Sequence, residues 1–313
     1  HGYSLSVDPD MKVDMSYSGV CAVLENDQKR IEIYKESLPY NVSQQAYINY
    51  SNKFIQNTAD HTKEFETQTT INGKKVHILQ WSRQKLSGVE NDKNYYVAIE
   101  ILSGTREIYT VFAKADTPFY LTGGYSYLID NFNIFAPTKA AYMRQAQPIP
   151  VEERGWNQET SDFYLEFFGP DSTLKWGIFQ PKAPDDFTQM KWLETSMEYE
   201  FPILLNYTNV NDKYRHPDLD ARLENTYKQN KTLELTLQTI ETGDGGNMVY
   251  DVLNGEYDEF LKSYAQTVSD FDHPVLFRLG NEMNGDWCPY SGFHTSKDTM
   301  IFKEFYRYVH KIF

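Results

Sequence analysis

Hydrophobic and polar positions alternate with period two in several short runs of the first 137 residues, a pattern typical of half-buried strands. The clearest are runs 67–71 and 75–81, joined by Asn72-Gly73, a dipeptide that supplies the positive φ angles of a tight hairpin turn. Two segments instead carry apolar residues at helical spacing, 43–55 with Ser43 as N-cap and 123–135. Other alternating runs predict further strands at 3–7, 31–34, 95–101 and 107–114. We therefore expect an antiparallel sheet covered on one side by two helices.

From residue 174 onward, short apolar runs alternate with amphipathic helical segments. The predicted strands are 174–179, 201–207, 232–238 and 275–279, and the predicted helices are 185–199, 217–228, 249–268 and 298–313. Such alternation implies a parallel sheet. The last run, Val275 to Leu279, is of the kind that is buried on both faces, although Arg278 interrupts it. A proline-containing linker with a lead-in helix, 138–173, separates the predicted domains 1–137 and 174–313.

Charge and cysteine content limit the classes of function. The formal net charge of -14 argues against nucleic acid or an anionic membrane surface as partner. No run of eighteen apolar residues predicts a membrane span, and no signal peptide is visible. Cys21 and Cys288 fall in different predicted domains, so we expect two free thiols rather than a disulfide. Because no His/Cys/Asp cluster has ligand spacing, we expect neither a metal nor a cofactor.

The candidate chemistry lies directly after the last predicted strand, where Asn281 and Glu282 are followed by Trp287. In a barrel of parallel strands, residues at this end of a strand point into the shared pocket. A carboxyl group beside an amide donor and a flat aromatic ring suits glycosidic-bond cleavage, because the acid protonates the leaving oxygen while the amide holds a sugar hydroxyl. The alternative is that Glu282 is a solvated loop carboxylate.

Other residues near strand ends are candidates for the same pocket. Asn206 and Gln238 either hydrogen-bond a sugar hydroxyl or are satisfied by backbone groups. Arg278, if it points inward, either pairs with a carboxylate such as Glu234 or contacts the active site. Tyr290 follows Trp287 in the same loop and is expected to shape the cleft.

Two resemblances extend this interpretation. Asn281-Glu282 at a strand end resembles the acid/base signature of the (β/α)8 glycosidase clan GH-A, and Glu282-Met283-Asn284-Gly285-x-Trp287 resembles family 26 glycoside hydrolases, the endo-β-mannanase and related endo-glucanase group. Typical mannanases of that family carry His where this chain has Asn281, a departure that concerns mannan specificity rather than the clan. Residues 1–137, from the opening Gly-Tyr-Ser-Leu motif to the closing helix, resemble the PsbP-like α/β fold.

The resemblances imply an α/β chain in which an antiparallel-sheet domain precedes the first half of a (β/α)8 TIM barrel. Such a barrel needs eight strands and roughly 250 residues, whereas about 140 residues follow position 173, so the chain looks truncated after its fourth unit. The missing half belongs either to the same gene product or to a second chain. A third possibility is that the protein is no longer an enzyme.

The implied function is a retaining endo-glycosidase on β-linked polysaccharide or oligosaccharide, of β-mannan or β-glucan type. Glu282 would be the general acid/base, with the nucleophile Glu expected beyond residue 313. The alternative is a non-catalytic carbohydrate-binding or cell-surface protein on a degenerate glycosidase fold. We expect either protein outside the cell or on the surface of a Gram-positive-type bacterium.

Overall fold

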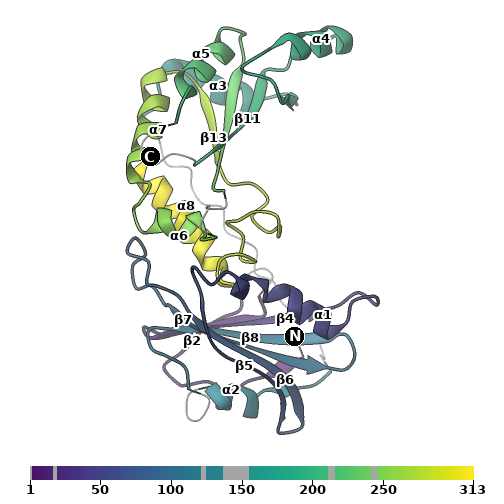
Figure 1. The fold of residues 1–313 in the computed structure, drawn as a ribbon. Coiled ribbons are helices and arrows are strands. Elements are labelled where there is room, and N and C mark those ends of the chain that lie inside the picture. Colours follow the sequence, from purple (N-terminus) through teal and green to yellow (C-terminus); the bar gives the residue numbers. More distant parts are fainter. Residues whose placement is uncertain (1, 17–19, 121–124, 137–154, 211–215, 241–244) are drawn as a thin grey trace. The chain divides into compact units, whose positions relative to one another are not determined.

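The computed structural model describes residues 2–16, 20–120, 125–136, 155–210, 216–240 and 245–313. The chain divides into two compact units with a boundary near residue 150, and each is described separately here (Figure 1). No described helix is long and apolar enough to cross a membrane. The predicted linker 138–173 lies partly outside the described residues, and its lead-in helix is observed as part of α3 (Gln158–Phe168).

The first unit contains an antiparallel sheet with the strand order β2-β3-β4-β8-β7-β6-β5. Its strands are β2 (Lys12–Asp14), β3 (Ala22–Glu25), β4 (Lys29–Ser37), β5 (Thr62–Ile71), β6 (Lys74–Ser82), β7 (Tyr95–Ser103) and β8 (Glu107–Ala115). The short strands β1 (Tyr3–Ser4) and β9 (Asn133–Ile134) form a separate pair. Pattern analysis missed β2 and β3, because β2 is wholly exposed and Ala22 to Leu24 are all buried, so neither strand alternates.

The predicted hairpin is confirmed. Ile71 pairs with Lys74 across Asn72-Gly73, whose φ angles are 48° and 76°. The predicted N-cap is also confirmed, because the Ser43 hydroxyl accepts a hydrogen bond of 3.1 Å from the backbone N–H of Ala46 at the start of α1 (Gln44–Ser51).

Helices cover both faces of this sheet, so the prediction of one covered side is wrong (Figure 1). Leu128 of α2 (Ser126–Asp130) packs in the core cluster of one face. On the other face, Ile48 of α1 and Phe54 of the 3-10 helix η1 (Lys53–Gln56) cover the sheet. The predicted helix 123–135 is observed only as α2, and residues 133 and 134 of that range form β9 instead. Residues 123–124 lie outside the described residues.

The second unit contains a four-stranded parallel sheet in chain order, as the alternating pattern predicts. Its strands are β10 (Gly177–Phe179), β11 (Ile203–Asn209), β12 (Thr232–Gln238) and β13 (Val275–Leu279). The helices are α3, α4 (Thr188–Met197), α5 (Leu219–Tyr227), α6 (Met248–Leu253), α7 (Asp258–Phe271) and α8 (Thr299–Ile312).

Side chains on one face of this sheet pack against helices. Side chains on the opposite face extend toward the candidate site. On the helical face, Phe277 stacks on Phe313 at 4.7 Å between ring centroids, and the Thr208 hydroxyl lies 3.1 Å from that of Tyr264 on α7. Because β13 is an edge strand, Phe277 is 39% exposed, and the prediction that 275–279 is buried on both faces is wrong.

Candidate functional site

An open cleft of about 470 Å³ lies beside the C-terminal end of β13. Gly280, at φ 64°, turns the chain there, and its N–H continues the ladder by donating to Leu237 O at 2.8 Å. Asn281 and Glu282 follow this turn, so they lie at the strand end as predicted. The cleft is lined by Tyr207, Arg278, Leu279, Gly280, Asn281, Glu282, Met283, Asn284, Phe302 and Tyr306.

Asn281 is held by a partly buried hydrogen-bond network. Its Oδ1 accepts a hydrogen bond from Gln238 Nε2. The Tyr290 hydroxyl accepts a hydrogen bond from Asn281 N at 2.9 Å and has its one proton to share between Asn281 O, at 2.7 Å, and Asn281 Oδ1, at 2.9 Å. Tyr290 is fully buried, and burial raises its pKa, so the hydroxyl stays protonated and able to donate. Among the described residues none accepts a hydrogen bond from Asn281 Nδ2, which leaves that amide group for a ligand.

This network changes the roles of two predicted substrate-binding residues. Tyr290 lies beneath Asn281 instead of in the cleft wall, because its ring is enclosed and packs near Phe302 at 5.8 Å between centroids. Gln238, at the end of β12, is engaged with Asn281 and with the Tyr290 hydroxyl at 3.3 Å. Both are thus positioning residues for Asn281.

Glu282 is an exposed side chain at the rim of the cleft, and Trp287 orients it. The indole Nε1 of Trp287 donates to Glu282 Oε2 at 2.8 Å. A Cβ on Gly285 would lie 2.5 Å from the indole ring, so glycine is needed for the ring to lie flat over the turn. Trp287 itself is 68% exposed, which leaves its ring open to a stacking partner.

Arg278 reaches the cleft from the face of β13 opposite the helices. Its Nε donates to Thr236 Oγ1 at 2.9 Å and lies 3.5 Å from Glu234 Oε1, the pairing named from the sequence. Its guanidinium carbon also lies 6.0 Å from the centroid of the Tyr207 ring. The side chain is 39% exposed, so it is not the buried cation that an inward-pointing arginine would be.

Asn206 does not lie in the cleft, so its predicted substrate-binding role is wrong. It is buried on the helical face of β11, where its Oδ1 accepts a hydrogen bond of 3.3 Å from Arg222 of α5. Its neighbour Tyr207 points to the opposite face and lines the cleft. Adjacent residues of a strand point to opposite faces of the sheet. The run 201–207 has no regular alternation of apolar and polar residues, so its sequence does not indicate which side chains face the cleft.

Pattern analysis also missed the contribution of α8. Phe302 and Tyr306 line the cleft, and Tyr306 is 50% exposed, whereas Phe305 between them is buried. All three residues recur at helical spacing. This spacing indicates a buried face of the helix, but it does not indicate which residues of that face line a cleft.

Neither cysteine is paired, so the two predicted free thiols, Cys21 and Cys288, are confirmed, and both are buried. Over the described ranges, no group of three His, Cys, Asp or Glu side chains could hold a metal ion.

Comparisons with known proteins give low similarity. No family profile and no curated protein matches the chain. A PsbP protein of the cyanobacterium Synechocystis sp. PCC 6803 aligns with 43% of this chain and 87% of its own, at 11% identity and a TM-score of 0.32. LpqN of Mycobacterium tuberculosis, involved in cell envelope biogenesis, aligns with 43% of this chain and 83% of its own, at 12% identity and a TM-score of 0.30.

A third solved structure, from Bacteroides thetaiotaomicron VPI-5482, aligns with 63% of this chain and 67% of its own, at 11% identity and a TM-score of 0.28. A PsbP protein is thus among the solved structures to which the chain is similar. The TM-scores are too low to carry a conclusion about family or function.

Proposed function

We propose that this chain carries the acid/base half of a retaining endo-glycosidase that cleaves β-linked polysaccharide of β-mannan or β-glucan type. The observation that carries the proposal is the position of Glu282, next to Asn281 and at the C-terminal end of a parallel strand, on the rim of an open cleft. Parallel α/β sheets place ligand-binding residues at this end of their strands.

Each cleft residue has a chemical role in this reaction. Glu282 protonates the leaving glycosidic oxygen and then removes a proton from the attacking water. Asn281 Nδ2 donates to a sugar hydroxyl at the cleavage subsite, with its orientation held by Gln238 and Tyr290. Trp287 offers its exposed ring to a neighbouring sugar while its N–H orients the Glu282 carboxylate.

The second carboxylate of the reaction belongs, in this proposal, to the other half of a (β/α)8 barrel. Retaining enzymes need a nucleophile roughly 5 Å from the acid/base. Glu234 is engaged with Arg278 and is not assigned that role. We place the nucleophile beyond residue 313, at the end of a seventh strand of the same gene product, or on a second chain.

The first unit is assigned a binding or spacing role. Its sheet resembles PsbP-like folds, and no catalytic constellation is evident in its sequence. We place the protein outside the cell or on the surface of a Gram-positive-type bacterium.

Substitution of the acid tests the enzymatic proposal. In the full-length gene product, Glu282→Gln should lower hydrolysis of its best β-glycan about 10²–10⁴-fold, the usual contribution of general acid–base catalysis. Glu259→Gln, an equally conservative change at an exposed position on α7, should leave the rate unchanged. Equal rates for wild type and Glu282→Gln, on every β-glycan that the protein cleaves, would remove the basis of the assignment.

A second candidate is a non-catalytic carbohydrate-binding protein. It is favoured by the exposure of Glu282 and Trp287, since an open aromatic ring can stack on a sugar without any reaction at the carboxylate. Glycan binding by this chain should then fall about tenfold with Trp287→Ala, and Trp192→Ala, an exposed tryptophan on α4, should leave it unchanged. Binding without hydrolysis by the full-length product favours this candidate, and hydrolysis excludes it.

A further inference from the structure

A row of polar side chains crosses the sheet of the first unit. Gln68, His77, Glu100 and Thr110 lie directly opposite one another on the neighbouring strands β5, β6, β7 and β8, so they share one face of the sheet. The last three are buried, at most 5% exposed. The next row on this face is apolar in β6, β7 and β8. Because a buried carboxylate costs free energy even when it is paired, the polar row calls for a reason beyond packing.

The buried groups hold a carboxylate at the surface in a fixed orientation. Asn52 Nδ2 donates to Glu100 Oε1 at 3.0 Å, and Glu100 Oε2 lies 2.5 Å from His77 Nδ1. The other ring nitrogen of His77, Nε2, lies 3.2 Å from Glu66 Oε1 on β5. Lys63 Nζ donates to the second oxygen, Glu66 Oε2, at 3.0 Å. The Glu66 side chain is 41% exposed, so a carboxylate held from two sides remains open to a ligand.

This carboxylate lies in a groove of about 550 Å³ between α1 and the outer strand β5. Gln45 and Asn49 of α1 line it, together with Glu66 and Gln68 of β5 and the buried His77 of β6. Its volume falls within the roughly 300–1,000 Å³ of small-molecule sites. Every residue of the groove belongs to the first unit.

The amide side chains of the groove offer both donors and acceptors. Gln45 Nε2 donates to Asn49 Oδ1 at 2.8 Å, which orients both amides and leaves Gln45 Oε1 and Asn49 Nδ2 for a ligand. None of the described residues hydrogen-bonds the side-chain amide of Gln68. Each oxygen of Glu66 keeps a further lone pair. Hydroxyl groups, which donate and accept at one atom, match this mixture.

We propose that this groove binds a neutral saccharide, with the Glu66 carboxylate accepting hydrogen bonds from two adjacent hydroxyl groups. An anionic ligand would meet Glu64 and Glu66. A cationic ligand would gain little, because Lys63 and His77 already occupy the carboxylate. The proposal gives a ligand class to the binding role of the first unit and does not depend on Glu282 as acid/base.

Titration of this chain with cellohexaose and with mannohexaose, followed by backbone amide NMR, tests the proposal. Trp287→Ala in the background weakens binding at the other candidate site. We expect saturable shifts of the amides of residues 45–49 and 63–68 with at least one of the two sugars. Glu66→Gln should raise the dissociation constant roughly tenfold or more, because it replaces charge-assisted hydrogen bonds. Glu90→Gln, the same change in an exposed loop, should leave it unchanged.

A second variant pair tests the amides. Gln68→Ala should weaken binding severalfold, since it removes one hydrogen-bonding side chain, whereas Gln84→Ala, also exposed, should not. Circular dichroism checks that each variant is folded. Absence of saturable shifts up to about 10 mM sugar, above the range of specific affinities, overturns the proposal, as does binding that both groove variants leave intact. Shifts confined to residues 280–290 overturn it too, but leave the glycosidase assignment standing.

Discussion

His61 and His77 are both buried in the first unit, yet their surroundings favour opposite protonation states. His61 is 3% exposed, its ring packs edge-on to Phe54, and its Nδ1 lies 3.1 Å from Asn57 O. Burial lowers the pKa of His61 to about 4. Burial also opposes a charge on His77, but contacts of 2.5 Å to Glu100 and 3.2 Å to Glu66 outweigh it and raise the pKa of His77.

Stability should therefore depend on pH in two windows. Because the unfolded chain protonates His61 near pH 6.5 and the folded chain near 4, stability falls as pH is lowered through this range, by up to about 1.4 kcal/mol per pH unit. His77 stabilises the fold fully below pH ~6.5, and this contribution is lost as pH rises through its higher folded pKa. NMR titration of the ring protons of His61 and His77 measures both pKa values and so checks the direction of each shift. A His61 midpoint near 6.5, or a His77 midpoint below it, contradicts the assignment.

At the scale of elements, the candidate site depends on the turn that joins β13 to the following loop. Gly280 has φ 64°, and a Cβ there would lie 3.1 Å from the Tyr290 ring and 3.2 Å from the Phe302 ring. The turn therefore brings the backbone of Gly280 against both rings. The residues after the strand reach the cleft because this position has no side chain.

Gly280→Ala should destabilise the chain by roughly 2–3 kcal/mol, since it combines backbone strain at positive φ with a crowded Cβ. Gly104→Ala is the matched control, because Gly104 also has positive φ, 54°, but a Cβ there has nothing within 4 Å. It should cost about 1 kcal/mol, the backbone part alone. Urea unfolding measures both. Equal losses would show that contact with Tyr290 and Phe302 contributes nothing.

At the scale of the whole molecule, each unit has its own core and its own buried ion pair. In the first unit Arg83 binds Asp92 through two hydrogen bonds of 2.7 Å, with both side chains at most 5% exposed. In the second, Lys231 Nζ lies 2.5 Å from Glu194 Oε1, and the two side chains are 7% and 11% exposed. Removing one partner leaves a buried charge without its counterion, which typically costs 3–5 kcal/mol.

Calorimetry should consequently show two unfolding transitions that respond to different substitutions. Asp92→Asn should lower one of them by roughly 10 °C, and Lys231→Met should lower the other by a similar amount. Wild-type chain at the same pH and salt is the reference for both. A single transition that both variants shift as a whole would mean that the two units unfold as one cooperative structure.

Local pattern predicted much of this fold. The Asn72-Gly73 hairpin, the Ser43 cap and the four strand–helix alternations all follow from backbone preferences and from period-two or helical spacing within a few residues. The position of Asn281 and Glu282 beside a cleft follows in the same way, because a parallel strand must end there. The side-chain roles at the site were less predictable, as Tyr290 and Gln238 show.

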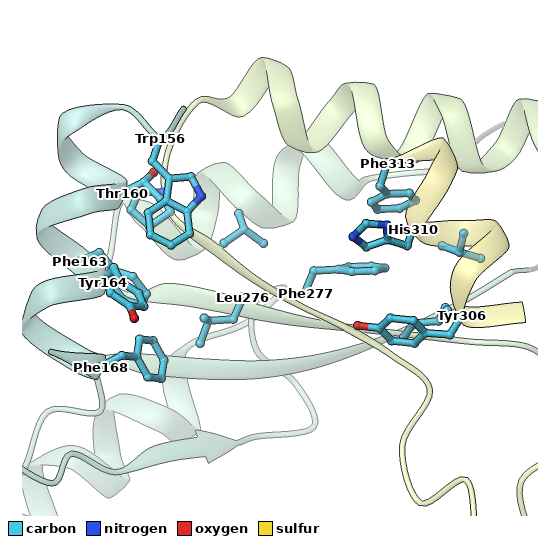
Figure 2. Close-up of a pocket in the computed structure, with 14 residues that line it drawn as sticks. Trp156, Thr160, Phe163, Tyr164, Phe168, Leu276, Phe277, Tyr306, His310 and Phe313 are labelled. Atoms are coloured by element: carbon cyan, nitrogen blue, oxygen red, sulfur yellow. The ribbon is translucent and has the colours of Figure 1, made fainter. Parts of the chain in front are cut away.

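The sequence by itself determined most of the strands, the parallel sheet of the second unit and the place where a site would lie. Only the tertiary structure decided that Asn206 faces helix α5, that Tyr290 lies buried beneath Asn281, and that Leu276 and Phe277 of β13 line a groove with aromatic rings of α3 and α8 (Figure 2). The physical reason is distance along the chain. Strand and turn preferences act between near neighbours, whereas burial, pleat direction and hydrogen-bond partners depend on residues brought together from tens of positions away.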